Sequence, residues 1–278
     1  MIAAWLFAGW LTVEVATAAH PARIDARTSF VGVPVEEVET ETEDQLAVRG
    51  WLVRGSEQRI VILFAGHGGN RTSMLGQAEF YLEQDWAVLL PDLRATGESG
   101  GEHSGLGYAE RLDVAAWMRF VRERGFEEIG LHGQSLGAAA IAYAIGDGLR
   151  DYTFLVLDSM YDDVRHALHN RLAWIPFPAL ALKSAEWFAS RRLGVSLDEL
   201  RPIDCMPSID ATTLFISGKD DPYVSDSETE GLFWACGWPK KVHHPISSVR
   251  HEDLWLRDPE EYTAALEHFF RFLGEYTR

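Results

Sequence analysis

The chain has 278 residues, 47% of them hydrophobic and 24% charged, which is enough to bury the core of one globular domain. Its formal net charge of -17 repels phosphate groups, so composition argues against a nucleic-acid-binding protein. The two cysteines, Cys205 and Cys236, form no CxxC pair and no metal-ligand cluster. We interpret them as free thiols, with a single disulfide as the alternative.

Residues 1–22 form a hydrophobic N-terminal segment with several interpretations. Its apolar run approaches the length of about 20 residues that spans a bilayer only if Glu14 lies inside it. Residues 16–18 resemble a signal-peptidase site, but no basic residue precedes them, and Arg23 and Arg27 follow. We therefore expect a membrane-associated or exported N-terminus, either as an anchor or as a cleaved signal. A helix packed on a cytoplasmic protein is the alternative.

The sequence predicts one α/β domain over residues 30–278. Segments 35–40 and 46–53 partly alternate polar and apolar residues, which is typical of half-buried antiparallel strands at a sheet edge. Five short apolar runs follow, which suit parallel strands buried on both faces: 60–64, 86–90, 129–131, 154–157 and 213–216. A further strand is expected at 241–244.

Helical segments separate these runs and complete the α/β pattern. Residues 108–124 carry apolar side chains at the i, i+3, i+4 and i+7 spacing of one helix face. Near the C-terminus, Asp258 is expected to cap a helix, with Glu261 completing a capping box. Strands that alternate with helices predict a doubly wound, mostly parallel sheet. Residues 159–202 lack any strand signal, so we expect a helical cap inserted there, over the carboxyl edge where ligands bind in such folds.

The strongest chemical signal is Gly133-Gln134-Ser135-Leu136-Gly137, which lies between a buried run and a helix of small residues. Glycines permit a sharp strand-to-helix turn that holds a serine in a strained conformation with its hydroxyl exposed. We predict that Ser135 is a nucleophile. The alternative is a tight structural turn in which Ser135 only caps the helix.

A serine nucleophile needs a base to take its proton and an acid to orient that base. Asp221 follows the run at 213–216 with the usual spacing after a glycine, whereas the adjacent Asp220 is interpreted as a turn residue. His251 lies between the last strand and the last helix. His243 and His244 are its rivals, interpreted as structural histidines of that strand. We predict a triad of Ser135, Asp221 and His251, in the order serine, acid, histidine.

With these motifs in this order, the chain resembles the α/β-hydrolases, and among them the capped bacterial FrsA-like and serine-aminopeptidase-like groups. The resemblance covers residues from about 35 to the C-terminus. It implies the α/β-hydrolase fold with a helical cap, and it places residues 65–70 at the family's His-Gly oxyanion segment. Ala65 stands where the family has histidine. Backbone amides of His67 and Leu136 are then the expected oxyanion donors.

The loop at 92–99 matches the loop after the family's fourth strand. We expect it to be structural, and Arg94 is the one candidate in it for a substrate contact.

The resulting functional prediction is a serine hydrolase that cleaves carboxylic esters through an acyl-enzyme, with thioesters or small amides as further substrates. An acyltransferase on the same triad and a non-catalytic binding protein of the same fold are the alternatives. No cofactor and no metal is implied, because no HExxH or similar spacing occurs. The expected partner is a small ester, with no nucleic acid and with membrane association through residues 1–19 as the open question.

Overall fold

The computed structural model describes residues 2–172, 178–247 and 254–276. Within these ranges the chain builds a nine-stranded sheet in the spatial order β11-β10-β9-β8-β5-β6-β4-β3-β2, and a two-stranded sheet of β1 and β7. The strands are β1 His20–Pro21, β2 Ser29–Phe30, β3 Val33–Glu41, β4 Ala47–Val53, β5 Arg59–Phe64, β6 Ala87–Pro91, β7 Thr96–Gly97, β8 Glu128–Gln134, β9 Phe154–Asp158, β10 Thr212–Gly218 and β11 Lys241–Ile246.

The six neighbouring strands from β11 to β6 are parallel, and each pair from β6 to β2 is antiparallel. The predicted doubly wound, mostly parallel sheet with an antiparallel edge is therefore confirmed. Strand β5 shows why the central strands are continuous apolar runs. Ile60, Ile62 and Phe64 belong to one core cluster, whereas Val61 and Leu63 belong to the other. Each residue from Ile60 to Phe64 faces a packed layer, so none of these five can be polar without a partner.

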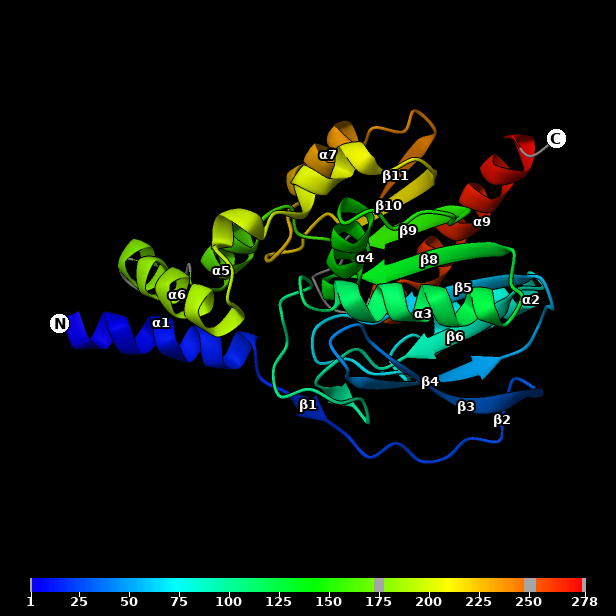
Figure 1. Ribbon diagram of the computed structural model, residues 1–278. Helices are drawn as coiled ribbons and strands as arrows, with labels where there is room; N and C mark the ends of the chain where they lie inside the picture. The colour runs from blue at the N-terminus through cyan, green and yellow to red at the C-terminus, as the bar shows by residue number, and fades with distance from the viewer. Residues whose placement is uncertain (1, 173–177, 248–253, 277–278) are drawn as a thin grey trace.

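Helices cover both faces of this sheet (Figure 1). The described helices are α1 Ile2–Ala16, α2 Leu75–Glu83, α3 Arg111–Glu123, α4 Leu136–Gly146, α5 Val164–Leu172, α6 Pro178–Leu193, α7 Asp226–Ala235, α8 Leu254–Arg257 and α9 Pro259–Tyr276, with the 3-10 turns η1 Leu197–Glu199 and η2 Pro202–Ser208. Buried residues of α3, α4 and α7 join one core cluster. Those of α2, α8 and α9 join the other.

The cap lies beyond the carboxyl ends of the parallel strands, where α5 and α6 stand beside α1 (Figure 1). The described part of 159–202 contains α5, α6 and η1 and holds no strand. Helix α1 packs along α6 at Gly9, where a Cβ atom would lie only 1.8 Å from the hydroxyl oxygen of Ser184. The Ser184 hydroxyl donates to the carbonyl of Trp5 at 2.8 Å. No helix in the described ranges combines the length and apolar character needed to cross a membrane.

The structure tests two predicted details, the state of the cysteines and the cap of the last helix. Cys205 and Cys236 are free thiols, and burial raises the pKa of Cys205 to about 11. Asp258 caps α9 as predicted, because its carboxylate accepts the N–H of Glu261 at 3.0 Å. The predicted capping box is wrong in its second half. The Glu261 carboxylate accepts the N–H of Ser247 at 3.1 Å, which joins the end of β11 to α9.

Candidate active site

Ser135 occupies the turn between β8 and α4 in a strained backbone conformation. Its φ of 48° and ψ of -108° lie outside the regions that residues with a Cβ ordinarily adopt. Its N–H donates to the carbonyl oxygen of Asp158 at 2.7 Å, which ties the turn to the end of β9. Ser135 is 9% exposed, so its side chain lies at the surface of an internal space rather than on the outside.

Both glycines of the motif are required by close packing. A Cβ atom on Gly133 would lie 2.4 Å from the backbone nitrogen of Ala138. One on Gly137 would lie 2.2 Å from the carbonyl oxygen of Phe64, the last residue of β5. These distances are far below van der Waals contact, so the turn and the start of α4 can approach β5 only with glycine at both positions.

The glycine loop after β5 lies directly beside Ser135. A Cβ atom on Gly66 would be 3.6 Å from the Cβ of Ser135. Gly68 has a φ of 72°, and the N–H of Gly69 donates to the carbonyl of Gly66 at 3.0 Å, which closes a tight turn around His67. On the other side of Ser135, Leu136 is the first residue of α4. Amides at a helix N-terminus have no acceptor in the helix and carry its positive dipole end, so this corner can bind an anion.

The location of this corner in the sheet follows from the chain order. Strand β5 is followed by β6 on one side, after which the chain crosses to β8 on the other side of β5. Such a reversal is a topological switch point, and ligands of open α/β sheets bind outside the strand ends there. The glycine loop follows β5 and Ser135 follows β8, so both candidate elements lie at the switch point.

Asp221 follows β10 and is the buried member of the Asp220-Asp221 pair. It is 8% exposed, whereas Asp220 is an exposed turn residue. One carboxylate oxygen of Asp221 accepts the N–H groups of Tyr223 at 2.7 Å and Val224 at 2.9 Å. These bonds fix the carboxylate at the end of the strand, which is the preorganisation that an orienting acid needs.

His251 lies outside the described residues, so its role as the base stays a prediction. The flanking chain ends β11 at Ile246 and begins α8 at Leu254. Trp255 and Leu256, directly after that start, line a cavity of about 500 Å³ together with the glycine loop and Gln134. Trp255 and Leu256 therefore lie around the same cavity as Gln134, the residue that precedes Ser135.

The two rival histidines have structural settings in β11. His243 lies opposite Phe215 of β10, with its Nε2 at 3.0 Å from the Ser217 hydroxyl and 3.2 Å from the carboxylate of Asp226. His244 has no hydrogen-bond partner for its Nε2 among the described residues, and burial lowers its pKa. The contacts of His243 agree with its interpretation as a structural histidine.

A cavity of about 340 Å³ opens above Ser135, and its wall is mostly apolar. The cap contributes Val164, Ala167 and Leu168 of α5 to this wall. Sequence patterns missed the opposite wall, which is the N-terminal helix. Its contributors are Leu11, Thr12, Val15 and Ala16. An apolar segment at the N-terminus gives no local signal that it will line a cavity formed by residues far along the chain.

A second feature that the sequence did not predict is a buried polar chain beneath Ser135. The Tyr81 hydroxyl lies 2.9 Å from Nδ1 of His132, and Nε2 of His132 lies 3.0 Å from the Tyr262 hydroxyl. Tyr262 donates to the carboxylate of Asp158 at 3.0 Å. Burial lowers the pKa of His132 to about 3, so this imidazole is neutral at pH 7. The only signal in the sequence is a histidine directly after the apolar run at 129–131.

Arg94 is buried in an ion-pair network and is not among the described residues that line the cavity. Its guanidinium donates to Asp113 at 2.7 and 2.9 Å and to Asp44 at 2.8 and 3.0 Å. In the same loop, Asp92 binds the buried guanidinium of Arg71 at 2.7 Å. These contacts support the structural role expected for the loop, and they leave no observation in favour of a substrate contact by Arg94.

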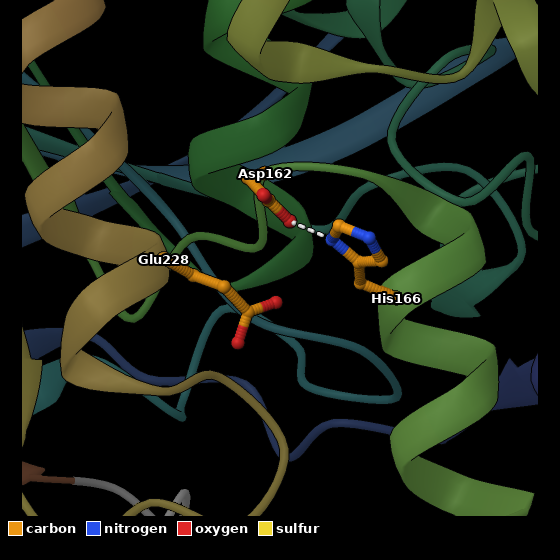
Figure 2. Close-up of side chains that lie close together, drawn as sticks. All are labelled: Asp162, His166 and Glu228. Atoms are coloured by element: carbon orange, nitrogen blue, oxygen red, sulfur yellow. Dashed lines mark hydrogen bonds and ion pairs between the residues drawn. The ribbon is translucent and has the colours of Figure 1, made fainter.

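One group among the described residues has the composition of a metal site. Asp162, His166 and Glu228 place their ligand atoms within 4.8 Å of one another (Figure 2). Asp162 bonds Nδ1 of His166 at 2.9 Å, which raises the pKa of that histidine. Glu228 accepts the N–H of Ser225 at 2.6 Å and so caps α7. The Asp162–His166 bond and the helix cap by Glu228 are structural roles that explain why these side chains lie here. Acidic groups near the surface often gather without an ion, so the cluster by itself does not indicate a metal centre.

Comparison with known proteins gives relatives in sequence and in structure. No family model matches the chain. The uncharacterized protein YqkD of Bacillus subtilis is 27% identical over 218 residues, which cover 73% of this chain and 70% of that protein. The Pyrococcus furiosus esterase Pf2001 has a similar structure, with a TM-score of 0.75, 22% identity and coverage of 91% of this chain and 97% of the esterase.

The α/β-hydrolase GrgF of Penicillium sp. sh18 is also similar, with a TM-score of 0.66, 18% identity and coverage of 88% of this chain and 99% of GrgF. The narrower resemblance to FrsA-like and serine-aminopeptidase-like groups stays a prediction. The fold prediction is confirmed, because sheet order, turn geometry and structural similarity agree that the chain has the α/β-hydrolase fold.

Proposed function

We propose that the protein is a serine hydrolase that cleaves carboxylic esters through an acyl-enzyme on Ser135. One observation carries the proposal. Ser135 is held in a strained turn at the N-terminus of α4, beside a glycine loop and at the base of an apolar cavity. Nucleophile, anion-binding corner and substrate space therefore meet at one point, which is the arrangement that acyl transfer requires.

In the proposed reaction, the Ser135 hydroxyl oxygen attacks the ester carbonyl carbon while His251 takes the hydroxyl proton. Asp221 orients His251 and stabilises its protonated form. The amides of His67 and Leu136 bind the negative oxygen of the tetrahedral intermediate. The intermediate collapses with loss of the alcohol, which receives the proton from His251. Water, activated by the same base, then releases the acid from Ser135.

The apolar cavity supports esters as the substrate class. The Pyrococcus furiosus neighbour is an esterase by its name, although at 22% identity this likeness shows the fold alone. The cavity wall is mostly apolar, which suits an ester with a hydrocarbon group better than a charged peptide. An acyltransferase would use the same residues with an alcohol or amine in place of water. Product analysis with competing alcohols separates the two.

The decisive experiment is active-site labelling. A fluorophosphonate probe should label the wild-type protein, and Ser135→Ala should abolish labelling and lower ester turnover by up to about 10⁶-fold. Ser227→Ala is the matched control, because Ser227 is exposed on α7 and should leave labelling intact. Undiminished ester hydrolysis by Ser135→Ala would refute the proposal.

The other two triad positions can be tested in the same assay. His251→Ala should be about as damaging as Ser135→Ala, whereas Asp221→Asn should leave more activity, since the acid orients the base without taking the proton. Asp220→Asn is the control, because Asp220 is exposed and adjacent. If Asp220→Asn lowers kcat more than Asp221→Asn does, the acid has been assigned to the wrong residue.

A further inference from the structure

The N-terminal helix α1 lies against the cavity that holds Ser135. Leu11, Thr12, Val15 and Ala16 line this cavity from one side, opposite the residues of α5. Leu11 and Val15 are 44% and 61% exposed although both are large and apolar. They border the opening of the cavity, so their apolar surface is available to a molecule that enters it.

The helix presents hydrocarbon rather than hydrogen-bonding groups to the cavity. The Thr12 hydroxyl donates to the carbonyl of Ala8 at 2.8 Å, within α1 itself. Tyr161, another lining residue, donates its hydroxyl to the carbonyl of Leu106 at 2.7 Å. Polar groups of the wall are thus engaged inside the protein. A ligand along this wall gains by burying apolar surface and gains little from polar substituents.

Contacts near the middle and at the end of α1 fix the position of this helix. Near its middle, Gly9 allows direct backbone contact with α6, and Arg192 of α6 pairs with Glu14. At its end, the carbonyl of Ala16 accepts a hydrogen bond from Nε2 of His67 at 2.9 Å, and the Thr17 carbonyl accepts the N–H of Ser104 at 3.0 Å. A wall that is anchored to the cap and to the glycine loop keeps a defined position relative to Ser135.

We propose that α1 is a wall of the acyl-binding site, along which an apolar acyl chain of the ester extends from Ser135 past Ala16, Thr12 and Leu11. The inference rests on the proposed esterase function and adds the substrate class to it. The N-terminal segment is then a determinant of chain-length preference. Short esters need only the nucleophile and the oxyanion donors, whereas longer acyl groups draw binding energy from this wall.

The test uses the full-length protein and p-nitrophenyl esters of acetate, butyrate, octanoate and decanoate. Val15→Trp adds bulk at the mouth of the cavity, at a position where 61% exposure leaves room for it. Each methylene of the acyl chain that is buried against the wall contributes about a fourfold gain in binding. If the new side chain displaces about two methylenes of the octanoyl chain, kcat/KM for octanoate should fall on the order of tenfold relative to acetate. Leu11→Trp, at another exposed position of the same face, should shift the ratio in the same direction.

Phe7→Trp is the matched control. Phe7 lies one turn before Leu11, is 59% exposed and does not line the cavity, so the octanoate-to-acetate ratio should stay at the wild-type value. An unchanged ratio in both cavity-facing variants, or an equal fall on all four esters, would overturn the role of α1 while leaving the esterase proposal intact. A wild-type protein that hydrolyses none of the esters would overturn the esterase proposal, and this inference with it.

Discussion

Replacing Tyr262 by phenylalanine tests how much the buried polar chain beneath Ser135 contributes to the stability of the fold. The hydroxyl of Tyr262 donates to the Asp158 carboxylate, so its oxygen must accept from Nε2 of His132. The other imidazole nitrogen, Nδ1, then accepts the hydroxyl proton of Tyr81. The chain of donors therefore runs in one direction, from Tyr81 through the imidazole and Tyr262 to the carboxylate. Tyr262→Phe breaks it in the middle.

The cost follows from the groups left without a partner. The buried carboxylate of Asp158 loses the hydrogen bond that it accepts from Tyr262, and a bond to a charged group contributes about 1.5–3 kcal/mol. The Nε2–H of His132 loses its acceptor, which costs about 1–3 kcal/mol. Both residues are fully buried, so water cannot replace the missing oxygen without a rearrangement. Because neighbouring terms are not additive, we expect Tyr262→Phe to lower the free energy of unfolding by about 3 kcal/mol.

Urea denaturation followed by tryptophan fluorescence measures this change. Tyr143→Phe is the matched control, because Tyr143 is also buried but its hydroxyl has no hydrogen-bond partner among the described residues. Its removal should leave the free energy of unfolding unchanged or slightly raised. If the two variants differ by less than about 0.5 kcal/mol, the hydrogen-bond chain does not contribute to stability in the way inferred here.

Two further predictions follow from buried charges and titrating groups. Arg94→Met should lower the free energy of unfolding by about 3–5 kcal/mol, since Asp113 would stay buried without its partner, and it should leave the chain-length profile of ester hydrolysis unchanged. A changed profile would show that Arg94 does contact substrate. For His132, the unfolded chain takes up a proton near a pKa of about 6.5 and the folded chain only near about 3, so stability falls as the pH is lowered from 6.5 towards 3. An NMR titration in which the His132 imidazole protonates near pH 6.5 would contradict this.

Local patterns predicted the elements that carry the proposed chemistry because those elements are defined by neighbours in sequence. The apolar run before Ser135 and the small residues after it determine a strand, a turn and a helix without reference to the rest of the chain. Strand β8 extends from Glu128 to Gln134, further than the apolar run at 129–131 indicated, because ladder bonding to β5 and β9 continues past it. His132 within that strand is tolerated only because it finds Tyr81 and Tyr262, which the sequence places far away.

The N-terminal segment shows what local patterns cannot decide. It is apolar on almost every side, so it has no periodicity that would distinguish an anchor, a signal and a packed helix. The contact that fixes its position joins Gly9 to Ser184, which are 175 residues apart in the sequence, so no local pattern reveals it. Likewise, Glu261 has the spacing of a capping box, but the end of β11 brings Ser247 within 3.1 Å and the carboxylate binds there.

Ser135 lies between the sheet core on one side and the cavity lined by α1 on the other, and changes on the two sides should have separable effects. A residue other than glycine at a φ of 48° costs free energy, so the surrounding contacts must hold it there. On the core side, Asp158 holds the Ser135 N–H with its carbonyl oxygen and is itself held by Tyr262. On the cavity side, Leu11 and Val15 of α1 line the space that the proposed substrate enters, and neither residue holds the turn. Damage to the core side should therefore appear in stability and in turnover on every ester, whereas damage to α1 should appear in the preference among esters.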